Sequence, residues 1–310
     1  MVKNNEKIII LGASGFLGSA ISQFFFNQGF TVIGVDIVNP NRRENYSQFY
    51  KITSIEKELN SILTEHQADL LINLIGNVNI AGSLINPRSD FHSSANLFSF
   101  ILDQIRSLSK DTKVIFLSSA AVYGQPKTLP ISETANCLPL SPYGYHKRLC
   151  ELIAEEYALI YGIKTVSLRV FSAYGNGLKR QILWDLCNKC SSSELVELSG
   201  DGNESRDFIH SEDISKAILC IYKQADFLGE FYNVASGKET TILELAHQIL
   251  FEFGKNKNYL KFNQIDRSGD PKNWHADIRR IKSFGFSTGV NLSDGLSEYI
   301  NWFKNNANRN

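Results

Sequence analysis

Tyr143 and Lys147 stand four residues apart in the stretch SPYGYHK, residues 141–147. Side chains four apart share one face of a helix. A Ser-Pro pair is typical of a helix start, with Ser141 as the cap and Pro142 in the first turn. A phenol and an ammonium on one face could together move a proton. The same pair also fits an ordinary helix surface, so its interpretation depends on the rest of the chain.

A second stretch that could bind a ligand is the loop GASGFLG, which follows the apolar stretch KIIIL. Gly12 permits a tight turn, Gly15 lets the backbone approach a pyrophosphate, and Gly18 allows a following helix to pack closely. The helix N-terminus would then face the anion. We therefore expect the loop to bind a dinucleotide through Gly12, Ser14, Gly15, Phe16, Leu17 and Gly18.

Asp36 ends the apolar stretch TVIGVD, 18 residues past Gly18. An acidic side chain at this place can accept hydrogen bonds from adenosine ribose hydroxyls. A carboxylate there would repel the 2′-phosphate of NADP, so the sequence favours NAD. Arg42 and Arg43 follow shortly afterwards and are interpreted as solvated loop charges.

A scaffold of alternating strands and helices is needed to position these residues. Five apolar, β-branched stretches begin at Lys7, Thr31, Leu70, Lys113 and Thr165, and long helical patterns separate them. Such alternation predicts an α/β fold, a doubly wound parallel (Rossmann) sheet with both faces covered. We expect residues 1–170 to form the NAD-binding domain, with later elements near 206–236 returning to it. Residues 171–310 are expected to form mainly a smaller C-terminal lobe that binds the substrate.

Composition narrows the function classes. The chain has 310 residues, 43% of them apolar, and Lys plus Arg equals Asp plus Glu at 32 each. This balance gives no global field that would attract nucleic acid or an anionic membrane. Five dispersed cysteines suit free thiols in a reducing cytoplasm, and the N-terminus lacks a secretory signal pattern. The pair CNKC and the six scattered histidines lack the spacing of a metal site, so no metal is expected.

Eight ordered motifs together resemble the extended short-chain dehydrogenase/reductase superfamily, in its nucleotide-sugar epimerase/dehydratase branch. They are GASGFLG, SSAAVYG, SPYGYHK, LRVFSAYG, GDGNESRDFIHSEDI, FYNVASG, DRSGDP and SFGF. The resemblance implies that Tyr143 is the acid or base at a sugar hydroxyl, that Lys147 lowers the pKa of Tyr143 and holds the cofactor ribose, and that Ser119 hydrogen-bonds the same sugar oxygen.

The resemblance also implies where a nucleotide-diphosphate sugar would bind. Arg206 and Arg267 match family positions that grip the diphosphate, which suits the planar, two-pronged guanidinium. Lys179 and Arg180 are weaker candidates for the same anion. Ser172 stands where the family often has asparagine. A homodimer is a further family expectation.

Three functions remain open. A 4-epimerase would pass hydride from C4 of the sugar to NAD and back to the other face of a 4-keto intermediate. A 4-keto-6-deoxy sugar nucleotide reductase would use the same tyrosine with external NAD(P)H, and a non-catalytic NAD sensor would need only the glycine loop. Asp36 favours the epimerase, because one-way reductases more often use NADPH. The presence of Ser119, Tyr143 and Lys147 together argues against the sensor, which would not need residues for proton transfer. Ala120 and Ala121 occupy the places where 4,6-dehydratases carry an Asp-Glu pair, so dehydration is not expected.

Overall fold

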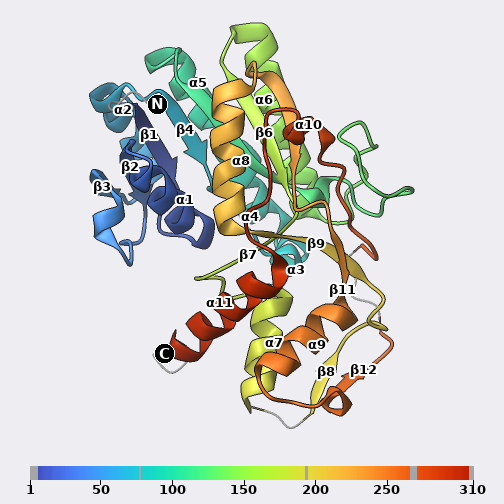
Figure 1. Cartoon of the computed structure of the whole chain (residues 1–310). Helices are drawn as coiled ribbons and strands as arrows, with labels where there is room; N and C mark the ends of the chain where they lie inside the picture. Colours follow the sequence, from blue (N-terminus) through green and yellow to red (C-terminus); the bar gives the residue numbers. More distant parts are fainter. Residues whose placement is uncertain (1–5, 77, 193–194, 266–270, 307–310) are drawn as a thin grey trace.

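The computed structural model describes residues 6–76, 78–192, 195–265 and 271–306, and its centre is a seven-stranded parallel sheet (Figure 1). The strand order is β3-β2-β1-β4-β5-β6-β10. These strands are β1 (Lys7–Leu11), β2 (Thr31–Asp36), β3 (Gln48–Lys51), β4 (Leu70–Asn73), β5 (Lys113–Ser119), β6 (Thr165–Val170) and β10 (Leu228–Val234). All neighbouring strands are parallel. The predicted doubly wound α/β fold is confirmed.

Helices cover both faces of this sheet because successive side chains of each strand point to opposite sides. In β1, Ile8 and Ile10 belong to one apolar core, whereas Ile9 and Leu11 belong to the other. The first core includes residues of α1 (Phe16–Asn27) and α8 (Ser211–Gln224). The second core is covered by α2 (Ile55–His66), α5 (Leu97–Leu108) and α6 (Pro142–Tyr161).

A smaller lobe lies below the sheet in Figure 1 and has a core of its own. Two small sheets with the orders β11-β9-β7 and β12-β8 accompany its helices. Their strands are β7 (Ser172–Tyr174), β8 (Val196–Leu198), β9 (Ser205–His210), β11 (Glu239–Thr241) and β12 (Leu260–Phe262). The helices are α7 (Gln181–Ser192), α9 (Ile242–Glu252) and α11 (Leu292–Asn306). Strand β10, although late in the sequence, lies at the edge of the main sheet beside β6.

The segment between β4 and α5 is more broken than its sequence suggests. Two short helices, α3 (Ile80–Ile85) and α4 (Pro87–Phe91), lead into a π-helical turn, η2 (His92–Asn96), which continues as α5. The segment is therefore a wide turn first and becomes a regular α-helix only from Leu97. The remaining short elements are α10 (Arg279–Lys282) and the 3₁₀ turns η1 (Arg43–Asn45), η3 (Ala120–Val122) and η4 (Lys257–Tyr259).

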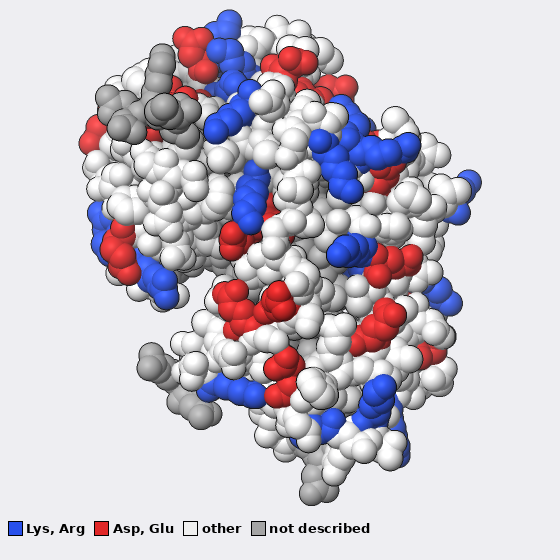
Figure 2. Space-filling view, in the orientation of Figure 1, with Lys and Arg blue, Asp and Glu red and all other residues white. Residues whose placement is uncertain are grey.

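On the face seen in Figure 2, acidic and basic side chains are interspersed rather than gathered by sign. This pattern matches the equal totals of the two signs in the sequence. In the parts of the chain that the structure describes, no helix has the length and apolar character needed to cross a membrane.

Candidate active site

The turn after β1 contains three glycines, and two of them, Gly12 and Gly18, could not be replaced without strain or a shift. Gly12 has a φ of +81°, a conformation that side chains disfavour. A Cβ at Gly18 would lie 2.1 Å from the carbonyl oxygen of Gly12, so only glycine lets α1 pack against the turn. Gly15 is the N-cap of α1, and a Cβ there would meet nothing closer than 3.4 Å. The backbone is thus open to a ligand at the helix start.

The start of α1 and the end of β2 suit a dinucleotide. Within the described chain no side chain caps α1, so its first N–H groups can face an anion. The Asp36 carboxylate accepts hydrogen bonds from the backbone N–H groups of Ser14, at 2.8 Å, and Val38, at 3.1 Å. These bonds fix the carboxylate at the carboxyl end of β2, beside the glycine loop. The glycine turn that a Cβ would fill, the open helix start and the acid fit NAD.

Helix α6 begins as its sequence predicts. The Ser141 side chain accepts a hydrogen bond from the Gly144 N–H at 3.3 Å, and Pro142 occupies the first turn. The Lys147 ammonium is buried, donates to the Leu117 carbonyl at 2.7 Å, and lies 5.9 Å from the centre of the Tyr143 ring. Tyr143 and Lys147 therefore do share one face, which is directed toward the carboxyl end of β5.

Two adjacent serines at the end of β5 have different roles. Ser119 lines the cavities described below, and its side-chain oxygen accepts a hydrogen bond from the Ala121 N–H at 3.1 Å. Ser118 borders only the first cavity, and its hydroxyl donates to Glu151 of α6 at 2.7 Å in the interior. The bond from Ser118 ties the carboxyl end of β5 to the helix that carries Tyr143 and Lys147.

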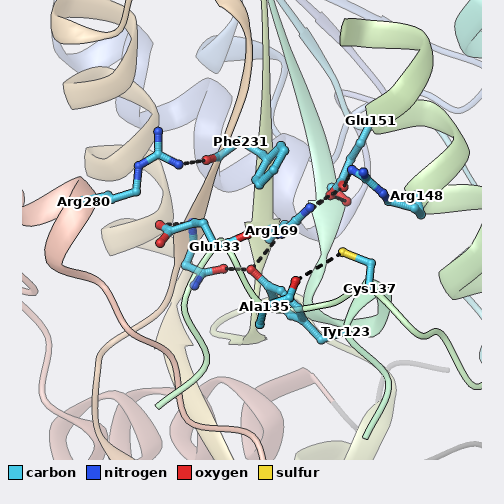
Figure 3. Close-up of polar contacts among 11 residues, drawn as sticks. Tyr123, Glu133, Ala135, Cys137, Arg148, Glu151, Arg169, Phe231 and Arg280 are labelled. Atoms are coloured by element: carbon cyan, nitrogen blue, oxygen red, sulfur yellow. Dashed lines mark hydrogen bonds and ion pairs between the residues drawn. The ribbon is translucent and has the colours of Figure 1, made fainter. Parts of the chain in front are cut away.

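Behind this pair lies a buried polar cluster, shown in Figure 3. Arg169 of β6 pairs with Glu151 and also donates to the hydroxyl of Tyr123 at 2.9 Å. Tyr123 in turn donates to the side chain of Asn233 in β10 at 2.6 Å. Burial raises the pKa of Tyr123, which keeps this phenol protonated as a donor. The cluster links three strand ends and α6 through satisfied hydrogen bonds.

Two cavities meet beside Tyr143. The first, of about 670 Å³, is lined by the glycine loop, Asp36 and Lys147. The second, of about 1010 Å³, extends toward the smaller lobe and is lined by Arg206, Lys272 and Trp274 among others. Ser119 and Tyr143 line both. The two hydroxyls predicted to act on the sugar therefore lie where a cofactor space adjoins a substrate space.

Two arginines, Arg206 and Arg267, were predicted to bind the diphosphate, and the structure describes the first of them. Arg206 lines the second cavity, where its guanidinium lies 5.5 Å from the Trp274 ring and donates to the carbonyl oxygens of Ser205, at 2.8 Å, and Lys272, at 3.0 Å. Arg267 lies outside the described residues. Arg180 lines both cavities, whereas Lys179 lines only the first.

Some site residues were missed by the sequence patterns. Ser83 of α3 is buried, and its hydroxyl accepts a hydrogen bond from the Tyr143 backbone N–H at 3.1 Å. Trp274 packs against Arg206, and its indole N–H donates to the Gly124 carbonyl at 3.1 Å. Both contacts join segments far apart in the chain, so no local signal marks them. In the described residues no group of three or more metal-ligating side chains occurs, and Cys187 and Cys190 pack in the lobe core.

Comparison with known proteins gives consistent results. The model of the NAD dependent epimerase/dehydratase family matches residues 8–235. A Methanocaldococcus jannaschii protein that carries the provisional name UDP-glucose 4-epimerase is 29% identical, over 96% of this chain and 99% of its own. A UDP-glucuronate 4-epimerase from Thermodesulfobacterium geofontis is 24% identical over 96% of both chains.

Among solved structures, the UDP-glucose 4-epimerase of Thermotoga maritima with UDP-glucose superimposes with a TM-score of 0.88 and 26% identity. The alignment covers 97% of this chain and 99% of that one. The family match spans more than half of the chain and includes the glycine loop, Ser119, Tyr143, Lys147 and Arg206. The chain is therefore an NAD-dependent enzyme that belongs to the NAD dependent epimerase/dehydratase family.

Proposed function

We propose that this enzyme is a UDP-sugar 4-epimerase. The observation that carries the proposal is the position of Ser119 and Tyr143 at the junction of the two cavities, between the NAD-binding turn and Arg206. A UDP-sugar that reaches from Arg206 to this junction presents its hexose to both hydroxyls. The relatives that carry 4-epimerase names support the same reading.

In this reaction Tyr143 takes the proton from the C4 hydroxyl and later returns it. Ser119 donates a hydrogen bond to the same oxygen and orients it. Its hydroxyl proton is available for this bond, because the Ser119 oxygen acts as the acceptor toward the Ala121 N–H. The buried Lys147 ammonium, 5.9 Å from the Tyr143 ring centre, stabilises a phenolate by its charge. When bound, NAD supplies the site that accepts hydride from C4 and gives it back.

The turn after Ser119 supports 4-epimerisation over dehydration. Ala120 and Ala121 are both buried in η3, and Ala121 lines the second cavity. A methyl group cannot protonate a leaving hydroxyl or remove a proton from C5. Of the described residues that line either cavity, the carboxylates are Asp36 and Glu204. Asp36 belongs to the cofactor end, and Glu204 accepts hydrogen bonds from backbone N–H groups of its own loop.

A direct experiment separates an epimerase from a reductase. The purified protein is denatured to test for released NAD, and native protein is incubated with UDP-glucose and with UDP-glucuronate without added cofactor. We expect bound NAD and inversion at C4, detected by NMR of the sugar. Stoichiometric NAD(P)H oxidation with a 4-keto-6-deoxy sugar nucleotide, and no inversion of either UDP-sugar, contradicts the proposal.

We also propose that the enzyme works as a homodimer in the cytoplasm. Exposed apolar side chains form a stripe along α6, namely Tyr145, Leu149, Leu152, Leu159 and Ile160. Helix α5 lies beside α6, where Arg106 stacks 5.3 Å from the Tyr161 ring centre. An apolar stripe of this length is typical of an interface, and a second copy of the chain fits it by self-complementarity. The five cysteines are free thiols, which suits a reducing compartment.

A further inference from the structure

The hexose position can be located more closely from the residues that line both cavities. These are Val78, Ser119, Tyr143, Phe171, Arg180 and Gln181. Asp36 lines only the first cavity, and Arg206 lines only the second. A substrate with its reacting carbon beside Tyr143 and its diphosphate beside Arg206 therefore places its hexose ring at this junction.

Arg180 brings a full positive charge to the junction. Its side chain is exposed and faces both cavities. Protein atoms packed around the guanidinium lower the pKa of Arg180, while the Tyr143 phenol acts in the opposite direction. The two side chains are thus electrostatic neighbours. Among the residues that the structure describes, Arg180 has no hydrogen-bond or ion-pair partner.

Neither of the described carboxylates that line the cavities forms an ion pair with Arg180, and both accept hydrogen bonds from backbone groups. Asp36 accepts from Ser14 and Val38 in the cofactor end. Glu204 accepts from the N–H groups of the residues at 201 and 202, at 3.1 and 2.9 Å. A ligand that carries a carboxylate can therefore supply the counter-charge for this guanidinium.

We propose that Arg180 binds the carboxylate of a hexuronate, so that the preferred substrate is a UDP-hexuronate rather than a neutral UDP-hexose. This inference rests on the function proposed above. In a hexuronate the carboxylate is attached to C5, next to the C4 hydroxyl on which Tyr143 acts. A guanidinium can give a carboxylate two parallel, charge-assisted hydrogen bonds. The Ser172 hydroxyl, which lines the second cavity, can donate a further bond.

The diphosphate is a less suitable ligand for Arg180. Arg206 and Lys272 line the second cavity alone, so cationic groups for the diphosphate are present away from Tyr143. A guanidinium at the junction faces the reacting end of the sugar instead. The two assignments predict different results, because every UDP-sugar has the diphosphate and only the hexuronate has the carboxylate.

The test compares UDP-glucuronate with UDP-glucose in wild-type enzyme and in Arg180→Met, with binding measured by calorimetry in the presence of NAD and C4 inversion measured by NMR. We expect wild type to prefer UDP-glucuronate. Arg180→Met should lower affinity and kcat/KM for UDP-glucuronate by about tenfold or more, as expected for lost charged hydrogen bonds. Its affinity for UDP-glucose should change by less than about threefold, since this sugar has no carboxylate for Arg180 to bind. The kcat should fall by a similar factor for both substrates, because Tyr143 loses a neighbouring positive charge. Arg180→Lys should restore part of the preference.

Lys179→Met is the matched control, because Lys179 is also a cation but lines only the first cavity. It should leave the ratio between the two substrates unchanged. An equal loss of affinity for both substrates in Arg180→Met overturns the inference and assigns Arg180 to the diphosphate. The inference about Arg180 is also overturned if the wild-type enzyme binds or inverts UDP-glucose but not UDP-glucuronate. Inversion of UDP-glucose would still support the 4-epimerase proposal.

The opposite result is distinguishable. If the wild-type enzyme prefers to bind UDP-glucuronate and Arg180→Met abolishes this preference, the inference is supported even when C4 is not inverted, and only the proposed reaction fails.

Discussion

Arg169 of β6 and Glu151 of α6 form a two-pronged ion pair in the interior, with N–O distances of 2.9 and 2.8 Å (Figure 3). The same carboxylate accepts hydrogen bonds from Ser118, at 2.7 Å, and Arg148, at 2.9 Å. Burial by itself lowers the pKa of Arg169, but its bonds to Glu151 outweigh burial and raise the pKa. Helix α6 is therefore held against β5 and β6 at the level of Lys147.

Breaking this pair should be costly. Glu151→Ala leaves the Arg169 charge buried without its counter-ion, and we expect the free energy of unfolding to fall by about 3–5 kcal/mol. Urea denaturation followed by circular dichroism measures this. The control is Asp103→Ala, which removes an exposed ion pair with Arg106 and should cost less than about 1 kcal/mol. A loss of similar size in both variants contradicts the prediction.

Tyr143→Phe removes the hydroxyl at the cavity junction and little else. We expect turnover of a UDP-sugar to fall by about 10²–10⁴-fold, the usual contribution of a general acid or base. Retention of NAD should be unchanged, because the ring and Lys147 remain. Tyr145→Phe on the exposed side of the same helix is the control and should keep activity. Full activity in Tyr143→Phe means that this hydroxyl does not act on the substrate.

Alanine substitutions at Gly18 and Gly15 should differ in their effect on stability, although both should weaken NAD binding. The Cβ of Gly18→Ala would meet the backbone oxygen of Gly12 at 2.1 Å, so α1 must shift, and we expect a destabilisation of about 1–3 kcal/mol together with loss of NAD. In Gly15→Ala the same oxygen is 3.4 Å away, so stability should hold within about 0.5 kcal/mol, while NAD binding weakens. Thermal melting and NAD titration separate the two effects. Equal melting temperatures for the variants contradict this explanation.

The parts of the fold and of the site that could be predicted are those marked by a pattern within one continuous stretch of sequence. Gly12, Gly15 and Gly18 share one turn, and Tyr143 and Lys147 share one helical face, so local spacing was sufficient to place each group. Five of the seven strands of the main sheet were also marked by apolar stretches that are long enough to be recognised as strands. Burial on both faces of the sheet produces such stretches.

Contacts between distant segments could not be read from the sequence. Arg169 and Glu151 are paired only because β6 folds against α6, and Ser83 reaches Tyr143 only after α3 packs on α6. The short strands of the lobe, such as β7 and β11, have three residues each, too few for a period to appear. The sequence marked Arg180 only as a weaker candidate for the diphosphate, because its position where the two cavities meet depends on the fold.

His210 should make stability depend on pH. It is buried, its Nδ1 accepts a hydrogen bond from the Glu212 N–H at 3.3 Å, and its Nε2 has no partner in the described chain. Burial lowers the pKa of His210 in the folded state, against the smaller opposing effects of nearby Glu298 and Asp213. The unfolded chain, with an ordinary pKa of about 6.5, then takes up a proton first. Stability is complete above that pH and is lost as the pH falls toward the folded-state value.

The variant His210→Asn tests this, because asparagine can keep the cap on α8. We expect the free energy of unfolding to decrease less between pH 7 and acidic pH in His210→Asn than in wild type, as measured by urea denaturation at several pH values. Part of the dependence should remain, since the pKa values of His66 and His247 are also lowered by burial. An identical pH dependence in the variant shows that His210 does not contribute.

The stripe on α6 should hold two copies of the enzyme together. Leu159 and Ile160 are 71% and 68% exposed, and the double variant Leu159→Glu, Ile160→Glu would place two charges at the proposed contact. We expect wild type to sediment as a dimer and the double variant as a monomer, because charges buried without partners oppose association. Phe251→Glu is the control: this side chain is 82% exposed on α9 of the smaller lobe and should leave the dimer intact. A wild-type monomer, or a dimer that persists in the double variant, rules out this interface.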